Sequence, residues 1–148
     1  MRKGTYVLFM TFRIPHILSV GTLGPLNINA GEYCYIGSAM NGLDSRIMRH
    51  LSGEKKMRWH IDRLTIVADG MEAYTSAGIG ECGLARIAVS SGCVPVFKGF
   101  GSSDCECDTH LFAVDGHSKE ELLRRSAVLP FSYDAAASSG TRSRFLPR

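Results

Sequence analysis

The pattern of hydrophobic positions changes its period once, early in the chain. Residues 33–36 are aromatic or apolar and predict a strand that ends at Gly37. After a short run of small residues, Leu43, Ile47 and Leu51 recur every four positions, which is typical of one face of a helix. The sequence therefore predicts a strand, a turn and an amphipathic helix in direct succession.

The other apolar segments predict short elements that alternate irregularly. Residues 4–12 are the longest strand candidate, in which Tyr6, Leu8 and Met10 share one face. A turn and a short strand at 17–20 would complete a hairpin with it. Beyond the hairpin we expect a loop at 21–31, helices at 59–68, 81–91 and 118–125, and strands at 71–76, 94–97 and 110–114.

These elements predict an α+β fold with a small, mostly antiparallel central sheet flanked by helices. The length of 148 residues suits one domain with a sizeable core. We expect residues 1–131 to form that domain. Residues 132–148 are small, polar and basic, and we expect them to form a weakly structured extension.

Composition and cysteine usage favour a cytoplasmic protein. No apolar run approaches the roughly 18 residues that a membrane span requires, so we expect no membrane association. The N-terminus leads directly into a strand pattern, without the apolar segment of a signal peptide. The five cysteines are an odd number, which argues against a secreted disulfide framework and favours reduced thiols.

Charge is unevenly distributed along the chain. Residues 46–63 carry six Lys or Arg against two acidic residues, whereas residues 64–123 carry three Lys or Arg against nine acidic residues. This separation predicts one surface for a phosphate backbone and another for a divalent cation, unless the basic segment is simply a solvated helix pair. The residues expected to contact nucleic acid are Arg49, Lys55, Lys56, Arg58 and His60.

Two polar residues lie at the edge of the apolar stripe on the helix at 43–51. At roughly 100° per residue, Arg46 and His50 project along the same edge, while Arg49 points further out toward water. A cation in this position, one turn after a strand, is oriented toward whatever the strand presents. The alternative is a surface arginine whose stem covers the core.

This arrangement resembles the GIY-YIG nuclease superfamily. Gly4-Thr5-Tyr6 corresponds to the first signature, Tyr35-Ile36-Gly37 to the second, and Arg46 to the helix arginine. Over most of the chain the sequence is similar to an uncharacterised prokaryotic branch of this superfamily, some members of which are fused to endonuclease-III-type glycosylases. The segments that carry this closer likeness include Arg49-His-Leu, Trp59-His-Ile-Asp, Glu81-Cys and residues 99–112.

The resemblance implies an endonuclease that cleaves DNA phosphodiester bonds with one Mg²⁺ or Mn²⁺, in DNA repair or processing. It implies that Glu81 holds the cation, that Arg46 binds the phosphate, and that Tyr6 or Tyr35 orients or deprotonates the attacking water. His50 could share that last role. Two departures from the family pattern are Thr5 in the first signature and Ser38, where many members have a cation. The alternatives are a non-catalytic nucleic-acid-binding module with the same fold and a zinc-stabilised interaction domain.

The cysteine-rich loop offers a second candidate site. Cys105, Cys107 and His110, together with Cys82, supply the four ligands of a Cys₃His zinc site. The Cys-x-Cys spacing is tighter than the usual Cys-x₂-Cys. The alternative is therefore a loop that covers the active-site face, with free thiols and solvated carboxylates.

Overall fold

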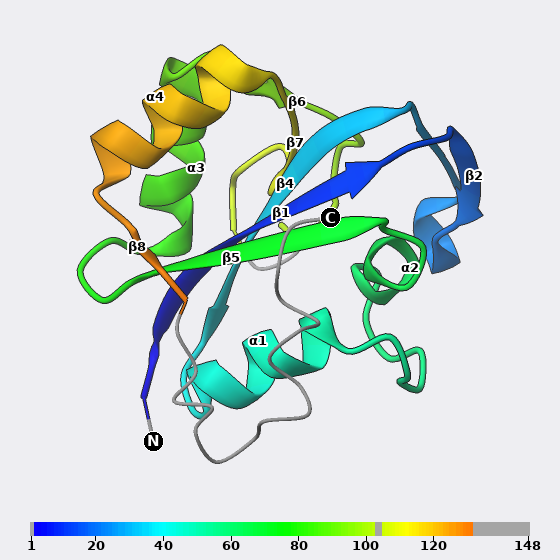
Figure 1. Ribbon diagram of the computed structural model, residues 1–148, viewed down its shortest axis with the longest axis horizontal. Coiled ribbons are helices and arrows are strands. Elements are labelled where there is room, and N and C mark those ends of the chain that lie inside the picture. Colours follow the sequence, from blue (N-terminus) through cyan, green and yellow to red (C-terminus); the bar gives the residue numbers. More distant parts are fainter. Residues whose placement is uncertain (1, 103–104, 132–148) are drawn as a thin grey trace.

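The computed structural model describes residues 2–102 and 105–131 (Figure 1). It confirms the α+β class: an antiparallel six-stranded sheet in the order β6-β7-β4-β1-β5-β8 carries helices on both faces. The strands are β1 (Gly4–Phe12), β4 (Gly31–Ala39), β5 (Gly70–Ser76), β6 (Val94–Pro95), β7 (Leu111–Val114) and β8 (Leu129–Pro130). The helices are α1 (Leu43–Leu51), α2 (Asp62–Thr65), α3 (Glu81–Ser90) and α4 (Gly116–Ser126).

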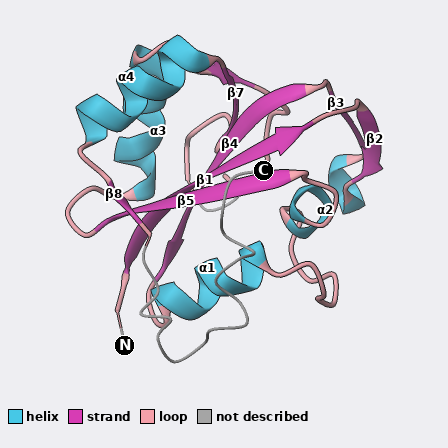
Figure 2. Cartoon of the chain, viewed as in Figure 1, coloured by secondary structure: helices cyan, strands magenta, loops and turns pink. Residues whose placement is uncertain are grey.

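Strand β1 lies in the interior of the sheet, and most of its side chains are buried on both faces. It pairs with β4 on one side and β5 on the other, and Tyr6 lies opposite Gly37 in the first of these pairings. On one face, Tyr6, Leu8 and Met10 pack with α1 and α2, as their spacing predicts. On the other face, Val7 and Phe9 pack with α3 and α4. Figure 2 shows the two pairs of helices on opposite sides of the sheet.

The prediction that the strand at 17–20 forms a hairpin with β1 is wrong. The short strand β2 (His16–Ser19) pairs with β3 (Pro25–Ile28) in a separate two-stranded sheet, and the single-turn helix η1 (Gly21–Leu23) connects them. The segment 21–31 was expected to be a loop because it is rich in Gly and Asn. Within it, however, buried Leu26 and Ile28 alternate with exposed residues, which is the burial pattern of a strand.

Element ends also differ from expectation. Strand β4 continues through Gly37 to Ala39, and the second helix is much shorter than the predicted 59–68. Helix α4 starts before Ser118, because the Asp115 carboxylate accepts the backbone N–H of Ser118 and the Ser118 hydroxyl bonds back to the Asp115 N–H.

Position 37 of strand β4 requires glycine because the ring of Tyr6 occupies the space that a side chain would need. A Cβ added at Gly37 would lie 2.5 Å from the Tyr6 hydroxyl oxygen and 3.1 Å from the ring of Tyr35. The glycine is thus a requirement of packing between neighbouring strands, not a turn signal.

The extension expected at residues 132–148 lies outside the described residues. In the part of the chain that the structure describes, no helix has the length and apolar character needed to cross a bilayer.

We predict that Gly37→Ala lowers the free energy of unfolding by about 1–3 kcal/mol, because the buried Tyr6 ring must shift to admit the methyl group. Urea denaturation measures the loss. The control is Gly78→Ala, where an added Cβ meets no described atom within 4 Å. Equal effects of the two substitutions would show that the close approach of Tyr6 does not determine stability.

Candidate functional site

A cleft of about 510 Å³ lies where β1, β4, α1 and the start of α3 meet. It brings together residues that are far apart in sequence. Seven of the predicted site residues line it: Tyr6, Tyr35, Arg46, His50, Arg58, His60 and Glu81.

Tyr6, Tyr35 and His50 form a contiguous cluster at the back of the cleft. The Tyr6 hydroxyl and His50 Nε2 are hydrogen-bonded at 2.7 Å, and both side chains are buried. The Tyr35 ring centroid lies 6.3 Å from that of Tyr6 and 6.3 Å from that of His50. The register of β1 against β4 fixes the tyrosines, and the edge of the α1 stripe presents the imidazole to them.

Burial sets the protonation of this cluster. Desolvation raises the pKa of Tyr6 well above its usual value, and it raises the pKa of Tyr35 to about 12. Burial and the nearby Lys55 ammonium lower the pKa of His50 to about 3. At neutral pH the cluster therefore holds two neutral phenols and a neutral imidazole. The cluster can pass protons, but it carries no charge.

Ser38 connects the arginine and the carboxylate of the cleft. Its backbone carbonyl accepts a hydrogen bond from Arg46 Nη1 at 2.9 Å, and its hydroxyl donates to Glu81 Oε1 at 3.0 Å. Arg46 also lies over the Trp59 ring, with Cζ 4.8 Å from the centroid. A small hydroxyl residue at position 38 thus holds both charged groups.

Glu81 is the first residue of α3, where a carboxylate complements the helix dipole. Its Oε2 lies 3.2 Å from His110 Nδ1, in a geometry outside that of a regular hydrogen bond. The contact with His110 lowers the pKa of Glu81, burial opposes this, and Ser38 and Arg46 add to the lowering. With 33% of its side chain exposed, Glu81 is an ionised carboxylate that faces the cleft.

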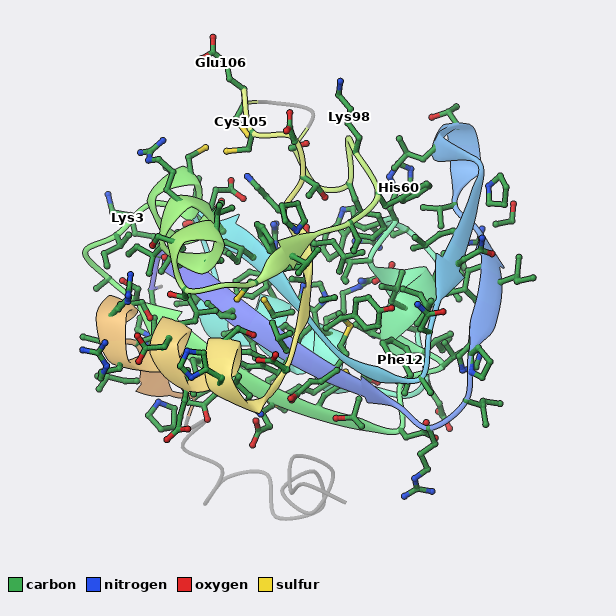
Figure 3. The ribbon with its side chains drawn as sticks, turned by 90° about the horizontal axis from the view of Figure 1, so that it is seen from above. Lys3, Phe12, His60, Lys98, Cys105 and Glu106 are labelled. Carbon is green, nitrogen blue, oxygen red and sulfur yellow. The ribbon has the colours of Figure 1, made fainter. Side chains whose placement is uncertain are left out.

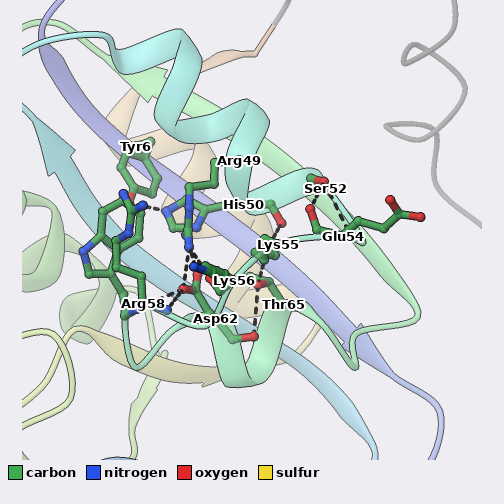
Figure 4. Close-up of polar contacts among 11 residues, drawn as sticks. Tyr6, Arg49, His50, Ser52, Glu54, Lys55, Lys56, Arg58, Asp62 and Thr65 are labelled. Atoms are coloured by element: carbon green, nitrogen blue, oxygen red, sulfur yellow. Dashed lines mark hydrogen bonds and ion pairs between the residues drawn. The ribbon is translucent and has the colours of Figure 1, made fainter.

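Arg49 does not point to water as its helical position predicts. It binds both carboxylate oxygens of Asp62, at 2.7 and 2.9 Å, and lies over the Trp59 ring at 4.3 Å (Figure 4). Asp62 is fully buried and also accepts the backbone N–H groups of Arg58 and Trp59. The aspartate pulls α1 and the following connection together, and this overrides the solvent-facing position on the helix.

The other predicted nucleic-acid contacts divide into two groups. The Lys55 ammonium donates to the His50 carbonyl at 2.8 Å and to the Thr65 hydroxyl at 2.7 Å. It therefore takes part in internal structure. Lys56, Arg58 and His60 are exposed, and the last two line the cleft.

The predicted cysteine cluster also forms. Four potential ligand atoms lie within 4.8 Å of one another, one each from Cys82, Cys105, Cys107 and His110. The cluster adjoins the cleft through the contact of His110 with Glu81. Cys34 and Cys93 pack instead in the core beneath α3 and α4.

Sequence reasoning missed Asp62 and Trp59 as organisers of the basic segment. Asp62 stands at the start of a helix, where an acidic residue is ordinary, and Trp59 fits an apolar stripe. The family resemblance includes the segment Trp59-His60-Ile61-Asp62, and the basic segment indicates His60 as a nucleic-acid contact, but neither predicts the network around Asp62. Its signal was the presence of the one tryptophan of the chain within a run of cations, where it can stack on guanidinium groups.

Comparison with known families shows the family of this chain. The model of the family described as "Domain of unknown function DUF123" matches residues 5–129. The chain belongs to the DUF123 family. DUF123 is a GIY-YIG-like family, which agrees with the superfamily that the two tyrosine signatures indicate. No curated protein and no solved structure matched the chain.

The DUF123 match spans every residue of the cleft and of the cysteine cluster. Both belong to the domain that defines the family.

We predict that the stability of this DUF123 domain falls as the pH drops from 6.5 toward 3, because the unfolded chain protonates His50 and the native chain does not. The contribution is complete above pH 6.5. Where it is lost, the slope approaches about 1.4 kcal/mol per pH unit. The pKa of Asp62, lowered to about 2 against burial by its bonds to Arg49 and to backbone N–H groups, adds a further loss only below pH 3.8.

Chemical denaturation of His50→Gln between pH 6.5 and pH 4 tests this prediction. The variant should have a flatter profile than wild type, whereas substitution of the exposed His117 by Gln should leave the slope unchanged. A wild-type slope in His50→Gln would place the acid sensitivity elsewhere.

Proposed function

We propose that this protein is a divalent-metal-dependent endonuclease that cleaves DNA phosphodiester bonds. The observation that carries the proposal is the convergence of Tyr6, Tyr35, Arg46, His50 and Glu81 on one cleft. Phosphodiester hydrolysis needs a cation site, a fixed donor for the phosphate oxygens and a route for the proton of the attacking water. The cleft offers a residue for each requirement.

Glu81 fits a hard divalent cation such as Mg²⁺ or Mn²⁺. It is the only carboxylate among the described residues that line the cleft, and each of its oxygens keeps a lone pair beyond its contacts with Ser38 and His110. A single carboxylate with water completing the coordination is a common way to hold Mg²⁺. When bound, the cation would stabilise negative charge on the phosphate and the leaving oxygen.

Arg46 is suited to hold the non-bridging phosphate oxygens. One N–H of Arg46 Nη1 donates to the Ser38 carbonyl, and the other N–H groups of the guanidinium remain available as donors. Stacking on Trp59 restricts the orientation of the fork. Because its hydrogen bond and its stacking are already formed, little side-chain entropy remains to be lost when the phosphate binds.

The tyrosine–histidine pair provides a proton route. In the tautomer with its proton on Nδ1, His50 accepts the Tyr6 proton at Nε2 while the Tyr6 oxygen accepts a proton from the attacking water. The resting pKa of His50, about 3, opposes this transfer. A phosphate anion in the cleft would favour it, because nearby negative charge raises the pKa of an imidazole. Tyr35, whose ring centroid lies 6.3 Å from that of Tyr6, would orient the water.

Exposed cations around the cleft fit a nucleic-acid backbone. Lys56, Arg58 and His60 lie in the connection beside it, where they could neutralise phosphates without reading bases. We place the activity in cytoplasmic DNA processing or repair, as suggested by the resemblance to a branch whose members are sometimes fused to glycosylases.

A second candidate is a module that binds nucleic acid without cleaving it. The raised pKa values of Tyr6 and Tyr35 favour this reading, because neither phenol is a strong base in the free protein. Incubation of supercoiled, branched and single-stranded DNA with purified protein and Mg²⁺ or Mn²⁺ separates the candidates. Binding to these substrates with no cleavage of any would support the module.

We predict that Glu81→Gln abolishes Mg²⁺-dependent cleavage and retains DNA binding, because the amide keeps the shape of the side chain and removes the charge that holds the cation. Gel-based cleavage and fluorescence anisotropy provide the two measurements. Glu106→Gln is the matched control, since that carboxylate is exposed and outside the cleft. Wild-type cleavage by Glu81→Gln would remove Glu81 from the mechanism.

We predict that Arg46→Ala lowers turnover at saturating DNA on the order of a hundredfold, with a small effect on affinity. Arg46→Lys should restore only part of the turnover, because an ammonium lacks the bidentate fork. Neutralising Lys56 and Arg58 should instead weaken DNA binding and leave turnover at saturating DNA nearly unchanged. It should also lower the slope of log affinity against log salt by roughly one per lost phosphate contact.

Kinetics measured across a salt series distinguish these two groups of variants. Lys55 is left unchanged, because its internal hydrogen bonds would confound the reading. If Arg46→Ala changes only the salt-dependent affinity, Arg46 is one more backbone contact and the proposed phosphate clamp is wrong.

A further inference from the structure

Four soft metal ligands are grouped at the edge of the cleft. Cys82 lies on the first turn of α3, Cys105 and Cys107 lie in the loop before β7, and His110 directly precedes that strand. Their nearest ligand atoms lie within 4.8 Å of one another. A tetrahedral zinc site with metal–ligand distances of about 2.0–2.3 Å places its ligands about 3.3–3.8 Å apart, so side-chain movements of about an ångström are enough to close the shell.

His110 is held in place before any metal binds. Its side chain is fully buried, and its Nε2 lies 3.4 Å from Cys105 Sγ. Its backbone N–H donates to the Phe100 carbonyl at 2.8 Å, and its own carbonyl accepts from Ile36 N–H at 3.0 Å. The imidazole is thus a rigid ligand on which the more exposed cysteines of the loop can converge.

We propose that Cys82, Cys105, Cys107 and His110 bind one zinc ion in a closed, structural Cys₃His site. Thiolate and imidazole ligands favour Zn²⁺ over Mg²⁺, whereas the carboxylate of Glu81 favours the reverse, so the two neighbouring sites select different ions. Four protein ligands leave no open position for a substrate. The zinc site rests on these ligands alone and is independent of whether the cleft cleaves DNA.

The zinc site would also orient the candidate catalytic carboxylate. With Nε2 on the metal, the proton of His110 would reside on Nδ1, which lies 3.2 Å from Glu81 Oε2. A turn of the carboxylate from its present orientation would bring this contact into hydrogen-bond geometry. The same loop forms a wall of the cleft: a Cβ added at Gly101 would lie 2.8 Å from the Tyr35 ring. Zinc would therefore fix both the direction of Glu81 and the position of the loop against Tyr35.

The first test measures metal content. The full chain, purified under reducing conditions without chelator, should contain about one zinc per chain by mass spectrometry of the metal. Replacement of zinc by Co²⁺ should give the intense ligand-field and thiolate-to-metal bands of a tetrahedral thiolate site. Wild-type protein that contains no zinc after expression in zinc-supplemented medium, and that gives no such bands with Co²⁺, would overturn the proposal. So would a disulfide among the three cysteines in the reduced preparation.

Variants connect the metal to the named ligands. Cys107→Ser should reduce the zinc content to near zero and lower the melting temperature, whereas Cys34→Ala should retain zinc even if it lowers stability, because Cys34 is buried outside the cluster. Full zinc content in Cys107→Ser would exclude this ligand set. If that variant does not fold, the Co²⁺ spectrum of the wild-type protein decides.

The link to Glu81 is tested by spectroscopy rather than by activity. Glu81→Gln should keep one metal per chain but shift the ligand-field bands of the Co²⁺ form, because the hydrogen-bond partner of the ligating His110 loses its charge. Glu106→Gln is the control: it removes the same charge from an exposed residue between two cluster cysteines, and its side chain points away from the domain (Figure 3). Identical spectra for wild type and Glu81→Gln would break the link, whether or not the protein is a nuclease.

Discussion

The close approach of the Tyr6 ring to the backbone of Gly37 determines the geometry of the cleft. Because Gly37 has no side chain, the Tyr6 phenol can occupy the space beside it on the neighbouring strand, and the Tyr6 hydroxyl reaches His50 on α1. The helix stripe supplies the contacts that hold α1 at this distance, with Ile47 and Leu51 buried against the same face of the sheet. Packing and the candidate chemistry therefore depend on one absent methyl group.

The basic segment is organised around a buried negative charge. Asp62 neutralises Arg49 and fixes the backbone at Arg58 and Trp59, which leaves the Trp59 ring in contact with both guanidinium groups of α1. A buried carboxylate is stable here because each of its oxygens accepts from charged or backbone donors. Among the exposed side chains of this segment, Arg58 and His60 line the cleft.

Local patterns predicted the parts of this structure in which period and burial agree. The strand at 4–12 and the helix at 43–51 have clear periods, and the structure places both where they were expected. The partner of β2, the continuation of β4 through Gly37 and the inward turn of Arg49 depend on residues distant in sequence. The tyrosine signatures indicated which residues would meet. The role of Ser38 in holding Arg46 and Glu81 requires coordinates, because a lone serine after a strand has no distinctive pattern.

Both edges of the six-stranded sheet end in strands of two residues that contain proline, Val94–Pro95 in β6 and Leu129–Pro130 in β8. Proline has no N–H to offer, and so short a strand presents few free donors and acceptors in a row. A foreign strand that approached along β6 or β8 would find little to pair with. Next to an exposed, partly apolar cleft, these two edge strands therefore offer no long template for β-type aggregation.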